Sequence, residues 1–187
     1  FDIVDEPNER LTRLAKKYPL FFLNVNVTKE DEVRSAVDKI EKKWGVPTIL
    51  INNAGWRSSP HVASKGGVSF EDYPMEIWEE VFSVNATAAA ICSKIVGGKI
   101  IKKRRKGVII NIASMYAVVA PDNRIYAYKK PPFIKDAPYG ASKAALVALT
   151  RDLAVQWAPF GIRVVAISPG GVEHSKSDPR FVKNYSS

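Results

Sequence analysis

The chain has 187 residues, of which 46% are hydrophobic and 25% are charged, with 11 Gly and 12 Pro. This length predicts one domain, and the ordinary composition excludes a disordered, collagen-like or low-complexity protein. The single cysteine, Cys92, excludes a disulfide framework and a cysteine-based zinc site, and it is typical of a reducing compartment. No apolar run approaches the roughly 18 residues that a membrane span needs. We therefore expect a cytoplasmic protein with no metal site and no membrane partner.

Lys and Arg number 28 against 19 Asp and Glu, which gives a net charge of +9. Residues 102–106 are all basic, and two interpretations are open for them. They are either a site for an anionic partner or the solvated end of a helix, where cations complement the helix dipole. No aromatic side chain interrupts the run to stack on bases, so no nucleic acid is expected as a partner.

Apolar segments of strand length alternate with longer segments of helical periodicity. Strands are expected at residues 1–5, 20–25, 48–51, 108–110 and 162–167, and helices at 8–18, 29–44, 74–103 and 139–157. Thr28 is expected to cap the second helix, and Gly97-Gly98 to loosen the third. The alternation, with central strands that are almost continuously apolar, predicts an α/β fold with a parallel sheet in a single domain.

In an open parallel sheet, ligands bind beyond the carboxyl ends of the strands. Small or polar residues follow the expected strands at these ends, at Asp5 and at residues 52–55, 111–114 and 168–171. Strand ends favour turn residues in any case, so this pattern by itself predicts only a ligand cleft.

Tyr139 and Lys143 are four residues apart, so they share one face of the last expected helix. A lysine ammonium beside a phenol favours the phenolate, and the pair would make Tyr139 a general acid and base. The same spacing also occurs by chance in many helices. Asn85 lies inside an apolar helix, where asparagine is unfavourable, and it is either a functional side chain or one that faces solvent.

Four segments in chain order resemble the short-chain dehydrogenase/reductase family of the classical type. These are Asn52-Asn53-Ala54-Gly55 after an apolar strand, Ser114 at the end of the next strand, Tyr139-x-x-x-Lys143, and Pro169-Gly170. The resemblance extends from residue 1 to about residue 171. It implies a Rossmann-like, doubly wound sheet and an oxidoreductase that uses NAD(P) on an alcohol or carbonyl substrate.

The resemblance also implies roles for four catalytic residues. Tyr139 would transfer the proton to or from the substrate oxygen, and Lys143 would assist it and bind the nicotinamide ribose. Ser114 would donate a hydrogen bond where charge develops on the substrate. Asn85 would hold a water molecule that relays protons from Lys143 to solvent.

For the cofactor, the resemblance implies contacts along the strand ends. The implied set is Asp5, Asn26, Val27, Asn53, Ala54, Gly55, Tyr139, Lys143, Pro169, Gly170 and Val172. A carboxylate at Asp5 would repel a 2′-phosphate, which favours NAD over NADP, although Asp5 is also placed to cap a helix. Asn26 stands where the family usually has Asp.

Three departures from the family pattern stand out. The glycine-rich turn of the first strand is absent, as are the substrate lid and last strand, so we expect residues 1–187 to be a fragment of a longer domain. His174 stands where the family usually has Thr, and we expect an exposed loop residue there. The segment from Ser114 to Tyr139 is about twice the usual length.

The extra residues, 121–138, leave one predicted catalytic residue and return to another. They form either a flap over the active site, with Tyr126, Tyr128, Lys129 and Lys130 contacting a sugar or phosphorylated substrate, or a surface excursion.

The sequence therefore predicts hydride transfer between NAD(H) and an alcohol or carbonyl compound, with a sugar or sugar derivative as substrate. The alternative is an inactive NAD-sensing or scaffold protein on the same fold. By resemblance, the alanine-rich faces of the helices around Asn85 and after Tyr139 would form a homodimer or homotetramer.

Overall fold

The computed structural model describes residues 1–4, 6–56, 67–130, 133–172 and 178–186. Its centre is a parallel sheet of three strands in the order β1 (Ile49–Asn52), β2 (Gly107–Ile112) and β3 (Ile162–Ile167). Ile49 lies opposite Val108, and Asn111 lies opposite both Asn52 and Ala166. The predicted α/β class with a parallel sheet is confirmed, and three of the expected strands are close to their predicted bounds.

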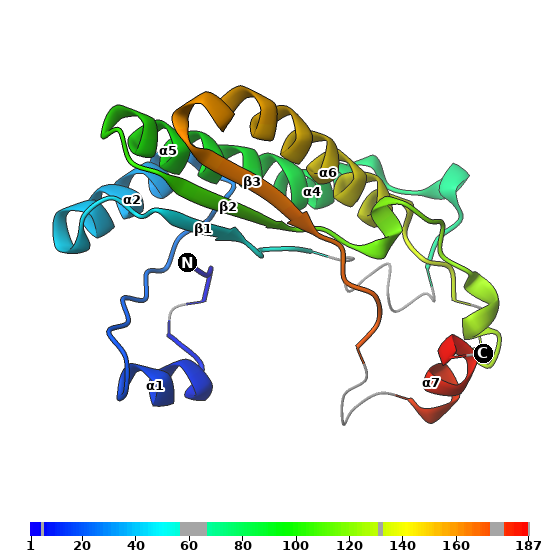
Figure 1. Cartoon of the computed structure of the whole chain (residues 1–187). Coiled ribbons are helices and arrows are strands. Elements are labelled where there is room, and N and C mark those ends of the chain that lie inside the picture. The colour runs from blue at the N-terminus through cyan, green and yellow to red at the C-terminus, as the bar shows by residue number, and fades with distance from the viewer. Residues whose placement is uncertain (5, 57–66, 131–132, 173–177, 187) are drawn as a thin grey trace.

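The other described elements are helical. They are α1 (Glu9–Ala15), α2 (Glu30–Trp44), η1 (Phe70–Asp72), α4 (Met75–Phe82), η2 (Ser83–Thr87), α5 (Ala88–Lys102), η3 (Met115–Ala117), η4 (Asn123–Tyr126), α6 (Ala137–Trp157), η5 (Ala158–Phe160) and α7 (Pro179–Ser186). Helices α5 and α6 lie along one face of the sheet, while α1 and α7 lie apart from this layer (Figure 1).

The core lies between the sheet and the helices on this face. Val33 and Val37 of α2, Ile100 of α5 and Ile109 of β2 are almost fully buried there, within one apolar cluster. The other face of the sheet presents apolar side chains to solvent, and Ile49 is 64% exposed. Side chains alternate between the two faces along each strand, and among the described residues α2, α5 and α6 pack against one of these faces.

The expected strands at 1–5 and 20–25 are wrong as regular strands. Among the described residues, these segments meet only at an isolated parallel bridge between Asp2 and Asn24, where the Val25 N–H donates to the Asp2 carbonyl at 2.8 Å. Two short extended segments that pair only with each other are marginal in water, because a stable sheet needs a third strand or a helix against one face.

The helical run from Met75 to Lys102 is continuous, and its irregularity lies at η2, where a π turn spans Ser83–Thr87. The expected loosening at Gly97-Gly98 is therefore wrong. A Cβ added at Gly97 would lie 2.6 Å from the ring of Trp157, so this glycine lets α5 and α6 approach closely. The basic run 102–106 is exposed at the end of α5, as its solvated interpretation requires.

The start of α2 differs from the expectation for Thr28. The helix has Lys29 at its N-cap without a side-chain hydrogen bond, and the Thr28 hydroxyl donates instead to Asn26 Oδ1 at 2.8 Å. Three acidic residues in the first turn, Glu30, Asp31 and Glu32, face the positive end of the helix dipole. At the start of α2, acidic side chains thus stabilise the helix end where a hydroxyl cap was expected.

Candidate active site

The carboxyl ends of the three strands meet at one edge of the sheet, and a cavity of about 450 Å³ lies there. Residues after β1, after β2 and after β3 line it, together with residues of α6, α7 and the 121–138 segment. The predicted site residues that line it are Asn53, Gly55, Ser114, Tyr139, Lys143, Pro169 and Gly170. Three of the four predicted catalytic residues thus share one cavity.

Lys143 and Tyr139 lie on successive turns of α6, which begins at Ala137, two residues earlier than expected. The Lys143 side chain is buried, and its Nζ donates to the Ile112 carbonyl at 2.7 Å. Burial lowers the pKa of the Lys143 ammonium, because a charged amine loses hydration. Nζ lies 5.9 Å from the centre of the Tyr139 ring, so charge on Lys143 acts directly on the phenol.

Ser114 reaches the same cavity through the turn that follows β2. Its backbone is extended, and its Oγ accepts a hydrogen bond from the Tyr116 N–H at 3.2 Å, which starts η3. A Cβ at Gly140 would lie 3.1 Å from the Tyr116 carbonyl oxygen. The absence of a side chain at Gly140 therefore lets η3 pack against the first turns of α6, and this brings Ser114 and Tyr139 together.

Asn85 lies behind the cavity and not in its lining, and its side chain is 1% exposed. The interpretation of a solvent-facing asparagine is wrong. Its Oδ1 accepts from the Trp56 N–H at 2.6 Å, and its Nδ2 donates to the Trp56 carbonyl at 2.8 Å and to Ser142 Oγ at 3.0 Å. Asn85 thus joins η2 to the loop after β1 and to α6.

A π turn explains how an asparagine inside a helix can point inward. The Ala88 N–H bonds to the Ser83 carbonyl, one residue further back than in an α-helix. A Cβ at Gly55 would lie 3.5 Å from Asn85 Oδ1 and 3.6 Å from Lys143 Nζ. Both polar atoms therefore border the space above Gly55.

A buried polar network below the cavity was missed by sequence reasoning. Asn52 and Asn111, one on each of two paired strands, point between the sheet and the helices. The Asn52 Nδ2 donates to Asn111 Oδ1 at 2.8 Å and to Ser93 Oγ at 3.1 Å, and the Asn111 Nδ2 donates to Thr150 Oγ1 at 2.8 Å. These bonds fix α5 and α6 against the strand ends. The sequence signal that could have revealed this network was an asparagine at equivalent positions near the ends of two paired strands, Asn52 and Asn111.

Four of the residues implied for cofactor binding do not line the cavity: Asn26, Val27, Ala54 and Val172. Val27 is partly buried and packs against the apolar core. Asn26 Oδ1 accepts from both the N–H and the hydroxyl of Thr28, which gives it a structural part in the turn before α2. Val172 is 80% exposed. Asp5 and His174 lie outside the residues that the structure describes.

The 121–138 segment contributes to the cavity wall, but only in part through the expected residues. Tyr126 and Lys135 line the cavity, whereas Tyr128, Lys129 and Lys130 do not. The Arg180 guanidinium carbon lies over the Tyr128 ring, 4.5 Å from the ring centre. Two described residues of the segment thus border the site, and its interpretation as a flap over the active site stays a prediction.

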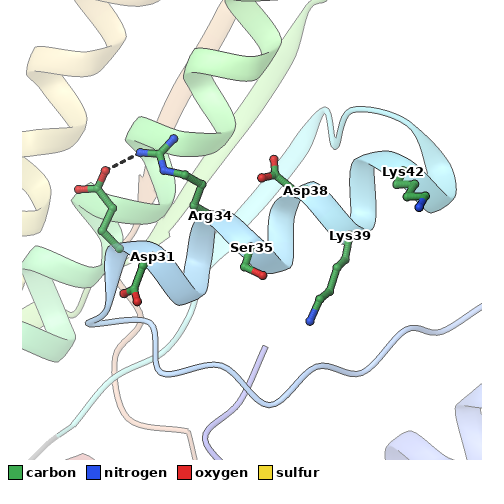
Figure 2. A pocket seen from close by; sticks show the side chains of 7 residues that line it. Asp31, Arg34, Ser35, Asp38, Lys39 and Lys42 are labelled. Atoms are coloured by element: carbon green, nitrogen blue, oxygen red, sulfur yellow. Dashed lines mark hydrogen bonds and ion pairs between the residues drawn. The ribbon is translucent and has the colours of Figure 1, made fainter.

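A second hollow lies along α2, as Figure 2 shows. One helix supplies all of its lining, and the labelled side chains point away from one another instead of toward a common centre (Figure 2). Both acidic and basic residues line it, and Arg34 pairs with Glu30 in the same helix. This surface does not assemble a site.

Two further features bear on the function classes. In the described part of the chain, no group of three His, Cys, Asp or Glu is arranged to hold a metal ion. The helical run Met75–Lys102 is long and apolar enough to cross a membrane by composition alone, but half of its most apolar window is buried inside the protein. A core helix of a packed domain passes the same test.

The comparisons with known proteins agree with this geometry. A family model for the short chain dehydrogenases matches residues 2–184. The chain belongs to the short-chain dehydrogenase family. It is 34% identical to the NAD-dependent glycerol dehydrogenase of Listeria innocua over 147 residues, which are 79% of this chain and 50% of that protein. It is 35% identical to the 5-keto-D-gluconate 5-reductase of Escherichia coli over 146 residues, 78% of this chain and 49% of that protein.

Solved structures of the family superpose on the same fold. A short chain dehydrogenase from Leptospira borgpetersenii with bound NAD+ has a TM-score of 0.73 and 32% identity, over 87% of this chain and 58% of that one. A gluconate 5-dehydrogenase from Burkholderia cenocepacia, in complex with NADP and tartrate, has a TM-score of 0.62 and 29% identity, over 79% and 50%. This chain spans about half the length of the relatives that it matches.

Proposed function

We propose that this protein is an oxidoreductase that transfers a hydride between NAD(H) and an alcohol or carbonyl substrate, a sugar or a sugar derivative. The observation that carries the proposal is the convergence of Ser114, Tyr139 and Lys143 on one cavity at the carboxyl ends of the strands. The turn after β2 supplies Ser114 and α6 supplies Tyr139 and Lys143, so the spacing of Tyr139 and Lys143 alone would not bring Ser114 to them. The names of the relatives, a glycerol dehydrogenase and a 5-keto-D-gluconate reductase, support a polyol or keto-sugar substrate.

The residues around the cavity fit the nicotinamide end of a dinucleotide. Gly55 and Gly170 border the cavity without side chains, so a planar ring and its ribose can approach the backbone. The Lys143 amine lies beside Gly55 and is placed to donate to ribose hydroxyls. When bound, the nicotinamide supplies or accepts the hydride.

The chain's own residues then handle the proton and the developing charge. Tyr139 donates its phenolic proton to the substrate oxygen during reduction and accepts one during oxidation. Ser114 donates a hydrogen bond to the same oxygen, where charge changes most in the transition state. Lys143 is held by the Ile112 carbonyl, and its Nζ lies 5.9 Å from the centre of the Tyr139 ring.

Asn85 acts from behind the cavity. Its bonds to Trp56 and Ser142 fix the loop after β1 and the first turns of α6, and so they hold Gly55 and Tyr139 in place. We propose that the space bordered by Asn85 Oδ1 and Lys143 Nζ holds the water of a proton relay. An amide oxygen has two lone pairs, so Oδ1 can accept from water as well as from Trp56.

The cofactor preference, the localisation and the oligomeric state are proposed from the sequence. A carboxylate at Asp5 favours NAD over NADP, because it repels a 2′-phosphate and accepts from the ribose hydroxyls. We also propose a cytoplasmic homodimer or homotetramer with α5 and α6 at the interface. An exposed apolar side chain on α6, Val155 at 77%, supports a partner surface there.

The test is a screen of cofactor oxidation by the purified full-length protein. NADH and NADPH would each be supplied with dihydroxyacetone, 5-keto-D-gluconate, L-sorbose and D-xylulose, and absorbance would be followed at the nicotinamide band. We expect oxidation of NADH with at least one of these carbonyl compounds, and a higher kcat/KM than with NADPH. Tight NADH binding without oxidation by any of them would favour the inactive NAD-sensing protein instead.

A further inference from the structure

The 121–138 segment places one lysine over the predicted catalytic tyrosine. Lys135 Nζ lies 5.8 Å from the centre of the Tyr139 ring and 4.7 Å from that of Tyr116. The backbone of Lys135 is fixed, because its N–H donates to Asn123 Oδ1 at 3.0 Å. Lys135 is half-buried and lines the cavity, with its Nζ over the two tyrosine rings.

The charge of the cavity lining has one sign. Among the described residues that form it, Lys135 and Lys143 are the charged side chains, and no Asp or Glu contributes. Lys143 is buried and bonded to the Ile112 carbonyl at the strand ends. Asp136 follows Lys135 in the chain, but its side chain is buried outside the lining. The described residues of the lining therefore contribute a net positive charge.

The wall that carries Lys135 is held by aromatic contacts. Tyr126 packs edge-on against Phe133 with ring centres 4.7 Å apart, and it stacks on Phe181 of α7 at 5.6 Å. Tyr185, also on α7, accepts a hydrogen bond from the Gly171 N–H at 2.7 Å. Phe133, two residues before Lys135, is thus joined to α7 through Tyr126, and this packing helps to preorganise the Lys135 cation.

We propose that Lys135 binds a carboxylate of the substrate, so that the protein acts on a hydroxy acid or keto acid. This inference rests on the proposed function, and it specifies the substrate class of the same site. One ammonium matches the single charge of a carboxylate, whereas a phosphate dianion is usually held by several donors or an arginine fork. The distance from Lys135 Nζ to the Tyr139 ring places the carboxylate within a few carbon atoms of the reacting carbon.

Binding of a matched pair of probes tests this without the need for turnover. Tartrate and the threitol of the same hydroxyl configuration share a four-carbon skeleton, and only tartrate has carboxylates. Their dissociation constants would be measured by calorimetry with the NADH-saturated full-length protein and with its Lys135→Gln, Lys135→Arg and Lys129→Gln variants. Lys129 is the matched control, since its Nζ lies over Tyr126 and Phe133 and it does not line the cavity.

We expect wild type to bind tartrate at least about tenfold more tightly than threitol, in line with a hydrogen bond to a charged group. Lys135→Gln should remove this preference, Lys135→Arg should keep most of it, and Lys129→Gln should leave it unchanged. Equal affinity for the two probes in wild type, or a preference that survives in Lys135→Gln, would overturn the inference. So would inorganic phosphate competing with tartrate at equal concentration, because the site would then be a phosphate site.

Three further outcomes distinguish carboxylate binding by Lys135 from a structural role of this lysine and from the proposed function. If Lys135→Gln weakens both probes equally, the lysine only supports the cavity wall, and the proposal is wrong. If the preference depends on Lys135 but no carbonyl compound is reduced, the carboxylate site stands and the proposed function fails. If sugars are reduced but the preference is absent, the proposed function stands and this inference fails.

Discussion

Asn85 uses its amide oxygen and both amide hydrogens inside the protein, on Trp56 and Ser142. Asn85→Ala should therefore lower the free energy of unfolding by about 1–3 kcal/mol, because it leaves partly buried polar groups without partners. Urea denaturation would measure the difference. A change below about 0.5 kcal/mol would mean that these bonds do not hold the loop and α6 together.

The catalytic candidates were predicted from an ordered set of motifs that resembles the family, and each of these motifs is local in the sequence. Tyr139 and Lys143 need only helical spacing to share a face, and Ser114 needs only to end a strand. Lys135 could not be predicted in this way. Its position depends on the path of an irregular segment, which is set by the bond to Asn123 and by the stacking of Tyr126 on α7, and neither has a period that a sequence reveals.

Residues implied for the adenosine end of the cofactor were harder to place. Asn26 was expected near adenine, but its side-chain oxygen accepts both donors of Thr28. A polar residue after a strand can serve a turn or a ligand, and the two uses look alike in sequence.

Helices α5 and α6 meet at Gly97 and Trp157. Gly97→Ala would place a Cβ 2.6 Å from the indole ring, so we expect about 1–3 kcal/mol of destabilisation from overpacking. Gly98→Ala is the matched control, because nothing lies within 4 Å of its added Cβ and alanine favours a helix over glycine by about 0.5–1 kcal/mol.

Thermal unfolding of both variants would test this contact. The account predicts a lower melting temperature for Gly97→Ala and an equal or higher one for Gly98→Ala. Equal destabilisation by both would contradict the close approach of the two helices.

Apolar segments that pack against other strands or helices form the strands that their pattern predicts, and segments without such neighbours do not. The pattern at 162–167 gave a strand because β2 and α6 pack against it. The pattern at 20–25 is equally apolar, but its segment pairs only at the bridge between Asp2 and Asn24 among the described residues. Strand propensity expresses fit to a half-buried surface, so the same pattern fails where that surface is missing.

At the scale of the whole molecule, Cys92 reports on opening of the core. Its side chain is 6% exposed, and burial raises the pKa of its thiol to about 11. An aromatic disulfide reagent at pH 8 should react only through unfolded molecules, because the thiolate is the nucleophile. Above pH 9 the unfolded thiol ionises while the folded one does not, so this residue makes stability fall as pH rises from 9 toward 11.

Ligand binding to the native state should slow this reaction. NADH at about 100 times its dissociation constant adds about 2.7 kcal/mol to the free energy of unfolding, which is about a hundredfold in labelling rate when opening is fast and reversible. A labelling rate at pH 8 that NADH does not change would contradict a dinucleotide site in this fold.

We propose Tyr139 as the general acid and base, and the Tyr139→Phe variant tests this role directly. With the best carbonyl substrate of the screen, kcat would be compared for wild type, Tyr139→Phe and the control Tyr128→Phe, whose ring packs on Arg180 outside the cavity. The account predicts a loss of about 10²–10⁴ in kcat for Tyr139→Phe alone, with NADH affinity within about twofold of wild type. Turnover by Tyr139→Phe equal to that of wild type would contradict it.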